Sequence, residues 1–322
     1  MKRMYIGLLV VAISGLLLSC SVGVKDNSTK VLDIGDYLYY GKYLDKPILW
    51  RIINLDKSGN PMLFSERILC IKPFNGANGG GEETYNFELL NKHIRVYWKD
   101  ANLRQWLNSS DQVIKWEGVP PSLEYVSRNP YELEAGFLSD KNFTRNEREI
   151  LLNHKHDVLL SEKDEKEKEG GSDSYYPIQS GRAANRLDDA EKDYSNIYYK
   201  TFTDKVFLLS TVEIKRYVWD RGWECRRKPT KEAVKVNTVR GFSDKDYCQF
   251  WLETPHCFGD SIWALSEEMR SLPKSPGLVT NCPTDGYTGV CPAVVLNKDL
   301  CKVKSGKGSE NKPYEIVPIS GE

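Results

Sequence analysis

Short stretches in which apolar and polar residues alternate recur along this chain, a pattern typical of β-strands. Residues 36–55 predict two strands separated by a turn at Lys46-Pro47. Five later stretches have the same character: 62–64, 68–71, 204–209, 249–255 and 289–296. Residues 314–316 predict an edge strand near the C-terminus. Because strands outnumber helices and do not alternate regularly with them, the pattern predicts a single α+β domain over residues 35–322, rich in antiparallel strands.

Helical periodicity occurs in three places. Residues 100–109 bring Leu103, Trp106 and Leu107 to one face of a helix, with Asp100 as its N-cap. Residues 143–152 predict a second helix, which begins with a capping box formed by Thr144 and Glu147. A third helix is expected to begin near Ser210 or Thr211, directly after an apolar strand. The sequence therefore predicts a few short helices beside the strands.

The N-terminus has the features of a secretory signal peptide. Met1-Lys2-Arg3 is positively charged, and residues 4–18 are apolar and uncharged. The apolar run is shorter than the roughly 20 residues that a spanning helix needs, but it suits a signal peptide. It ends in Leu17-Leu18-Ser19-Cys20, which resembles the lipobox of bacterial lipoproteins. We therefore expect a signal peptide over residues 1–19, the alternative being an uncleaved anchor with a chance cysteine.

Lipidation of Cys20 would determine the compartment. Its thiol would carry a diacylglyceryl group, and a further acyl chain such as palmitate gives the two chains that stable anchoring needs. Residues 20–34 then predict a lipidated cysteine and a flexible tether. We expect the domain to lie in the bacterial cell envelope, facing the periplasm or the cell exterior, with the lipid bilayer as a partner.

Composition excludes one class of partner. The chain has 45 Lys and Arg against 45 Asp and Glu, so its formal net charge is zero. With no basic excess, we expect no nucleic-acid partner. The charged, glycine-containing run at 161–174 predicts a solvated insertion rather than a binding site.

Cysteines cluster in the last third of the chain. Cys70 lies in an apolar run and predicts a buried free thiol. The six clustered residues are Cys225, Cys248, Cys257, Cys282, Cys291 and Cys301. An exported protein favours disulfides among them, with free thiols and a metal site as alternatives. The spacing contains no paired-cysteine knuckle, which weighs against metal, and the sequence leaves the connectivity of the bridges open.

No constellation of residues predicts catalysis. Cys257 follows His256 directly, and neighbours on a strand point to opposite faces. His154 and His156 would share a face on a strand and could bind a metal, but a solvated loop is the favoured interpretation. The sequence thus predicts no catalytic residue, no metal and no cofactor, and an activity is left open.

Tryptophan is the more informative residue type. Trp50, Trp106 and Trp251 lie in apolar stretches and predict core positions. Trp219, Arg221 and Trp223 lie instead in the segment YVWDRGWECRRK, beside further arginines. Exposed tryptophan and arginine are common in binding surfaces. We therefore expect these three residues to form a candidate binding surface for a glycan or a protein.

A set of landmarks in order along residues 35–300 carries a resemblance to a known family. The landmarks are WRII at 50–53, KPFN at 72–75, NLRQWLN at 102–108, DKVFLLS at 204–210, WLETP at 251–255 and GVCPA at 289–293. Together they resemble the bacterial domain of unknown function 6273 (DUF6273). This resemblance implies an exported or surface domain with no assigned activity. Its last strands are also similar to the formylglycine-generating-enzyme and C-type-lectin-like fold.

Two positions depart from the family pattern. Glu253 and Cys291 stand where the resemblance implies arginines, which would remove any role those arginines have in relatives. Cys291 could instead pair with Cys257 or Cys282. The copper-binding cysteines of a formylglycine-generating enzyme have no counterpart here, so that activity is not expected. The sequence favours a membrane-anchored, non-catalytic binding or envelope module, with an exported enzyme or a structural lipoprotein as alternatives.

Overall fold

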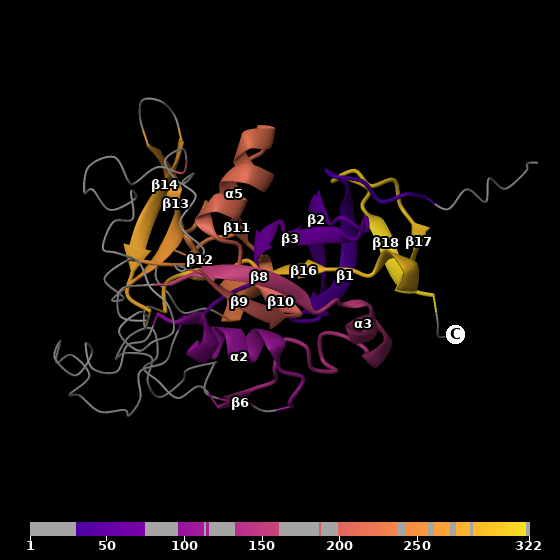
Figure 1. Cartoon of the computed structure of the whole chain (residues 1–322), viewed down its shortest axis with the longest axis horizontal. Helices are drawn as coiled ribbons and strands as arrows, with labels where there is room; N and C mark the ends of the chain where they lie inside the picture. The colour runs from indigo at the N-terminus through magenta and orange to yellow at the C-terminus, as the bar shows by residue number, and fades with distance from the viewer. Residues whose placement is uncertain are drawn as a thin grey trace, which may run out of the picture.

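Two β-sheets lie side by side and form the framework of the described chain (Figure 1). The computed structural model describes residues 30–74, 96–112, 114–115, 133–160, 187, 199–236, 242–256, 261–270, 275–283 and 286–319. Within these residues, strands predominate, helices are short, and most strand pairs are antiparallel, so the predicted α+β class is confirmed. No helix of the described chain is long and apolar enough to cross a bilayer.

The larger sheet contains seven strands in the order β10-β16-β3-β2-β1-β18-β17. Their bounds are β1 Tyr37–Tyr43, β2 Lys46–Leu55, β3 Pro61–Ser65, β10 Val206–Phe207, β16 Ala293–Val295, β17 Cys301–Ser305 and β18 Tyr314–Pro318. The strands β1, β2 and β3 form a meander, whose second turn is held by the Asp56 carboxylate accepting from the backbone N–H groups of Ser58 and Asn60. This sheet thus joins the two ends of the described chain, because β18 pairs in parallel with β1.

The smaller sheet contains five strands in the order β14-β13-β12-β15-β5. Their bounds are β5 Cys70–Ile71, β12 Phe250–Pro255, β13 Ile262–Arg270, β14 Ser275–Asn281 and β15 Gly289–Val290. The remaining strands form three two-stranded ladders: β4 Arg67–Ile68 with β11 Lys228–Pro229, β6 Ile114–Lys115 with β7 Leu133–Glu134, and β8 His154–Leu159 with β9 Tyr199–Asp204.

Short helices surround the sheets. They are η2 Trp98–Asp100, α2 Asn102–Asn108, α3 Arg145–Ile150, α5 Thr211–Tyr217, η7 Trp219–Arg221, α6 Lys231–Val236 and η8 Lys298–Leu300. The predicted capping box of Thr144 with Glu147 begins α3, and a capping box of Ser210 with Glu213 begins α5, where the third helix was expected to start. In α2 the residues Leu103, Trp106 and Leu107 are buried as predicted, but the N-cap is Ala101 rather than Asp100.

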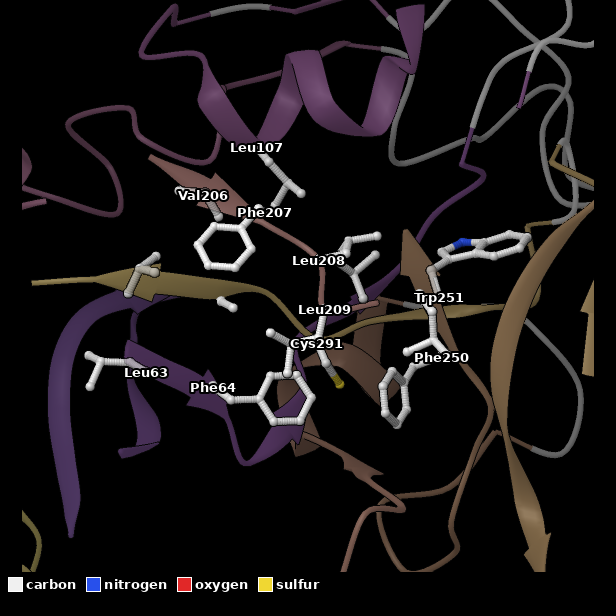
Figure 2. Packing of buried hydrophobic residues seen from close by; sticks show 14 of the residues in the cluster. Leu63, Phe64, Leu107, Val206, Phe207, Leu208, Leu209, Phe250, Trp251 and Cys291 are labelled. Atoms are coloured by element: carbon white, nitrogen blue, oxygen red, sulfur yellow. The ribbon is translucent and has the colours of Figure 1, made fainter. Parts of the chain in front are cut away.

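The core fills the junction of the two sheets (Figure 2). Phe64 of the larger sheet and Phe250 of the smaller sheet lie with their ring centres 6.1 Å apart, and Cys291 lies beside them. The predicted core tryptophans Trp50, Trp106 and Trp251 are fully buried. Each of the three indole N–H groups donates to a backbone carbonyl, which offsets the cost of burying a polar atom.

Three expectations about local structure are wrong. The turn between β1 and β2 lies at Leu44-Asp45, both with positive φ, so Pro47 belongs to β2. The predicted edge strand β18 is internal because β17 pairs with its outer side. The segment expected to be a free tether packs in part on the domain, since Leu32 and Ile34 lie against the core.

Candidate functional site

Two arginines and two aromatic rings meet at the place where the N-terminal segment joins the domain. We call Tyr37, Arg51, Arg221 and Trp223 the Arg–Trp cluster. Tyr37 and Arg51 are directly opposite each other on β1 and β2. The guanidinium carbon of Arg51 lies 3.8 Å from the ring centre of Trp223 and 4.8 Å from that of Tyr37, and the guanidinium of Arg221 lies 5.7 Å from Trp223. These distances are those of cation–π contacts.

The chain after α5 places Trp223 in this cluster. The turn η7 ends at Gly222, whose φ of 74° is left-handed and whose N–H donates to the Trp219 carbonyl at 2.8 Å. The next N–H, of Trp223, donates back to the Val218 carbonyl. Glycine tolerates this conformation without a steric cost, so the tight turn directs Trp223 toward Arg51.

Arg51 has aromatic neighbours but no counter-ion among the described residues. Its Nε atom is buried without a hydrogen-bond acceptor. Of the acids near Tyr37, Glu66 lies 3.6 Å from Arg227, and Glu310 is exposed. Burial, helped by the charge of Glu66, raises the pKa of Tyr37. The arrangement is chemically suited to an anionic group, because a guanidinium binds carboxylates and phosphates through its planar N–H donors.

The sequence identified half of this cluster. The structure brings Arg221 and Trp223 together, while Trp219 packs half-buried against the core on η7. Tyr37 and Arg51 were missed. These side chains reach Trp223 only because the turn after α5 packs against β1 and β2. No local pattern in the sequence predicts this contact.

A second group of charged side chains lies inside the protein, beneath the β8–β9 ladder. We call His156, Asp204, Glu253 and Arg104 the buried ion cluster. His156 Nε2 lies 2.9 Å from Asp204 Oδ2, and its Nδ1 lies 3.1 Å from Glu253 Oε2. Arg104 contacts the same aspartate through Nη2 at 2.8 Å, and the Trp98 indole donates to it at 2.9 Å. With the ionised Asp204 at one ring nitrogen and the Glu253 carboxyl group at the other, the imidazole is held in its protonated form.

Burial and pairing shift the pKa values of this cluster in opposite senses. Burial alone would lower the pKa of His156, but Glu253 and Asp204 raise it to about 10. Hydrogen bonds from His156, Arg104 and Trp98 outweigh burial and lower the pKa of Asp204. Burial dominates at Glu253 and raises its pKa to about 7 despite the neighbouring imidazolium. The cluster is therefore a compensated set of charges in a poorly solvated site.

Three of the four side chains in the buried ion cluster are closed to solvent, while that of Arg104 is 24% exposed. The side chains of His156, Glu253 and Asp204 are only 2%, 1% and 3% exposed. The predicted solvated loop around His154 and His156 is in fact strand β8. The two imidazoles share a face, with ring centres 6.2 Å apart, and His154 stacks on Phe207. Through these contacts the cluster holds β8 and β9 against the core.

Stability should depend on pH through Glu253. A carboxyl whose pKa is raised from 4.5 to about 7 by folding keeps its proton in the folded state over that interval, while the unfolded chain loses it. The free energy of unfolding should therefore fall as pH rises from 4.5 to 7, with a slope of at most about 1.4 kcal/mol per pH unit. Urea unfolding followed by tryptophan fluorescence measures this slope.

The matched variant for that experiment is Glu253→Gln, which keeps the shape but does not titrate. Its free energy of unfolding should decline less than that of the native protein between pH 4.5 and 7, because residue 253 no longer titrates. Identical slopes in the two proteins would show that Glu253 is already ionised in the folded state at the lower pH.

The expected disulfides are absent from the described cysteines. Cys225, Cys248, Cys291 and Cys301 are unbridged thiols, and Cys257 lies outside the described residues. Three of the four are buried, and Cys291 packs between rings of the core. Burial raises the pKa of Cys225 to about 12 and that of Cys301 to about 11, so these thiols are unreactive. Cys282 is exposed, and Cys70 is a buried free thiol as predicted.

Other expectations lie outside the described residues: the signal peptide, Cys20 and the charged insertion at 161–174. Glu253 and Cys291, which replace the arginines implied by the family pattern, are both buried. In place of an arginine, Glu253 contributes a carboxylate to the buried ion cluster, and the positive charges there come from His156 and Arg104.

The two sheets, the short peripheral helices and the buried ion cluster define a strand-rich α+β domain. A family model described as "Domain of unknown function (DUF6273)" matches residues 58–298. The match covers more than half of the chain, which belongs to this family. Strands β1, β2, β17 and β18 lie outside the matched residues and extend the larger sheet. No curated protein and no solved structure matches the chain.

Proposed function

We propose that this chain is an exported lipoprotein whose domain is a non-catalytic binding module held at a membrane by Cys20. The observation that carries the binding role is the Arg–Trp cluster. Arg51 contacts two aromatic rings but no carboxylate of the described chain, and Arg221 is exposed beside it. An arginine without a counter-ion is stabilised by an external anion.

The N-terminal sequence supports the anchoring role. The positive start, the apolar run and the Leu17-Leu18-Ser19-Cys20 segment suit export and acylation. The N-terminal side of the described chain is also where the Arg–Trp cluster lies, so the membrane attachment and the binding surface occupy the same end of the domain.

An exported enzyme is the second candidate. It is supported by the convergence of His156 and Glu253, whose atoms approach to 3.1 Å. Their burial weighs against it, because a catalytic group must reach its substrate. A purely structural role is the third candidate. It would not explain why Arg51 has no counter-ion among the described residues.

The fold suggests a related proposal. We propose kinship with the C-type-lectin-like fold of formylglycine-generating enzymes. The two segments that carry this likeness in sequence, in β12 and β15, are paired in parallel at Phe250 and Gly289. A shared fold does not by itself imply a shared activity.

Metabolic labelling tests the anchor. Bacteria that express the full chain should incorporate labelled palmitate into it, and Cys20→Ala should abolish the label. The variant should leave the membrane fraction, because the acyl chains supply the anchoring energy. A Cys282→Ala variant is the matched control, because it removes an exposed cysteine elsewhere. Absence of label, together with unchanged membrane retention of Cys20→Ala, would contradict lipidation.

A further inference from the structure

We propose that the Arg–Trp cluster binds phosphate groups of anionic lipids in the membrane that holds the N-terminus. This inference rests on the proposed anchoring and names the partner of the proposed binding surface. The domain would then lie on the bilayer through a defined face rather than hang from a free tether.

The path of the chain brings this face to the membrane. Lys30 donates to the Gly306 carbonyl at 2.9 Å, and Leu32 and Ile34 pack on the core. At Gly35 the chain reaches the cluster, where an added Cβ would lie 3.5 Å from the Trp223 ring. Only residues 21–29 separate Cys20 from this packed segment, and the ten steps from Cys20 to Lys30 span at most about 35 Å. Under the proposed lipidation, the cluster therefore stays within reach of the bilayer.

The surroundings of the cluster are rich in unpaired positive charge. Tyr37 donates its backbone N–H to the Gly308 carbonyl at 2.8 Å, which places the β17–β18 turn beside the cluster. Lys307 and Lys312 of that turn are exposed, and their side chains form no ion pair in the described structure. Each lysine or arginine near an anionic membrane surface favours binding.

Three acids face the same region, and two of them accept backbone N–H groups, which leaves their negative charges in place. Asp36 accepts the backbone N–H of Asp33, and Asp33 accepts that of Ile34. Glu310 remains exposed on the turn. The four cations Arg51, Arg221, Lys307 and Lys312 outnumber these three acids, so the net local charge favours an anionic surface.

The residue types are those that suit a membrane interface. Arginine binds phosphate through two parallel hydrogen bonds, and tryptophan is enriched at the level of lipid headgroups. Val31, directly before the packed segment, is 83% exposed, the highest fraction among the large apolar side chains of the described chain. An apolar side chain at this position would enter the headgroup region instead of water.

Hydrogen exchange on reconstituted protein tests the proposal. The full chain is purified in detergent and reconstituted into vesicles of phosphatidylcholine alone or mixed with phosphatidylglycerol. Backbone amides in residues 30–37 and 219–224 should exchange more slowly in the anionic vesicles, and raised salt should remove the difference. The double variant Arg51→Gln, Arg221→Gln should lower the ratio of docked to undocked domain about 30-fold. Each basic side chain near an anionic membrane raises this ratio by about a factor of five.

Two control variants make the result specific. Arg51→Lys with Arg221→Lys keeps both charges and should keep most of the protection. Arg145→Gln with Lys200→Gln removes two exposed charges from α3 and β9 and should change nothing. Figure 1 shows α3 and α5 on different sides of the molecule. Unchanged exchange in β3 and β16, which lie away from the cluster in the larger sheet, confirms that each variant is folded.

The outcomes separate this proposal from the anchoring on which it rests. Attachment to both kinds of vesicle with equal exchange of the cluster segments overturns docking and leaves anchoring intact. Binding to anionic vesicles alone supports docking and contradicts the anchor. Binding to neither kind of vesicle contradicts both the docking and the lipid anchor. Phosphatidylglycerol could slow exchange in the cluster segments of the native protein and of the double arginine variant equally. That result would also overturn docking through the two arginines.

Discussion

Replacing His156 with alanine should lower the free energy of unfolding by about 3–5 kcal/mol, the range found when one partner of a buried ion pair is removed. The imidazolium lies between Asp204 and Glu253, and both carboxylates are almost inaccessible to water. Asp204 would keep Arg104 and Trp98 as partners. Glu253 would lose its nearest positive charge, so the cost falls mainly on Glu253.

Equilibrium unfolding in urea at neutral pH measures this loss. The matched control is Lys155→Ala, an exposed residue on the same strand, which should change stability by no more than about 0.5 kcal/mol. Adding Glu253→Leu to His156→Ala should recover part of the loss, because the unpaired carboxylate is then gone. A loss below about 1 kcal/mol in His156→Ala would show that the cluster is not a close-paired set of charges.

Substituting Gly41 with alanine should destabilise the fold by about 2–5 kcal/mol, through backbone strain and overpacking together. Gly41 has a φ of 62° within β1, where the pairing with β2 shifts register. A Cβ there would lie 2.0 Å from Cε1 of Phe143. Phe143 cannot move freely, because its ring is buried between Tyr40 and Phe137.

Two comparisons separate the causes in the Gly41→Ala variant. Gly222→Ala shares the left-handed backbone, but a Cβ there meets no atom within 4 Å, so it should cost only about 1–2 kcal/mol. In a double-mutant cycle, Gly41→Ala and Phe143→Ala together should cost less than the sum of the single changes. Strict additivity would show that the contact with Phe143 is not the source of the loss.

The buried ion cluster and the Arg–Trp cluster suggest a division of roles. The first cluster compensates charge inside the fold and holds β8 and β9 on the core. The second lies at the surface and leaves Arg51 without a counter-ion among the described residues. We therefore place the proposed binding role at the second cluster, and we interpret the convergence of His156 and Glu253 as a stabilising feature.

Signals with a short range in sequence predicted the local structure well. The predicted capping box at Thr144 involves residues three positions apart, and the apolar face of α2 repeats every three or four positions. The core positions of Trp50, Trp106 and Trp251 followed from apolar neighbours. Local geometry fixes such contacts, so the strand-rich α+β class and the family could be recognised without coordinates.

Contacts between distant segments were decided by the tertiary structure. Glu253 reaches His156 only because β12 packs against β8, and Arg51 reaches Trp223 only because the turn after α5 folds back onto β2. Burial, which no local pattern measures, kept Cys291 an unbridged thiol in the core, and pairing with β17 made β18 an internal strand. Sequence by itself determined which elements form, because these depend on neighbours along the chain. The fold decided which charges meet, because pairing across sheets brings together residues that are far apart in sequence.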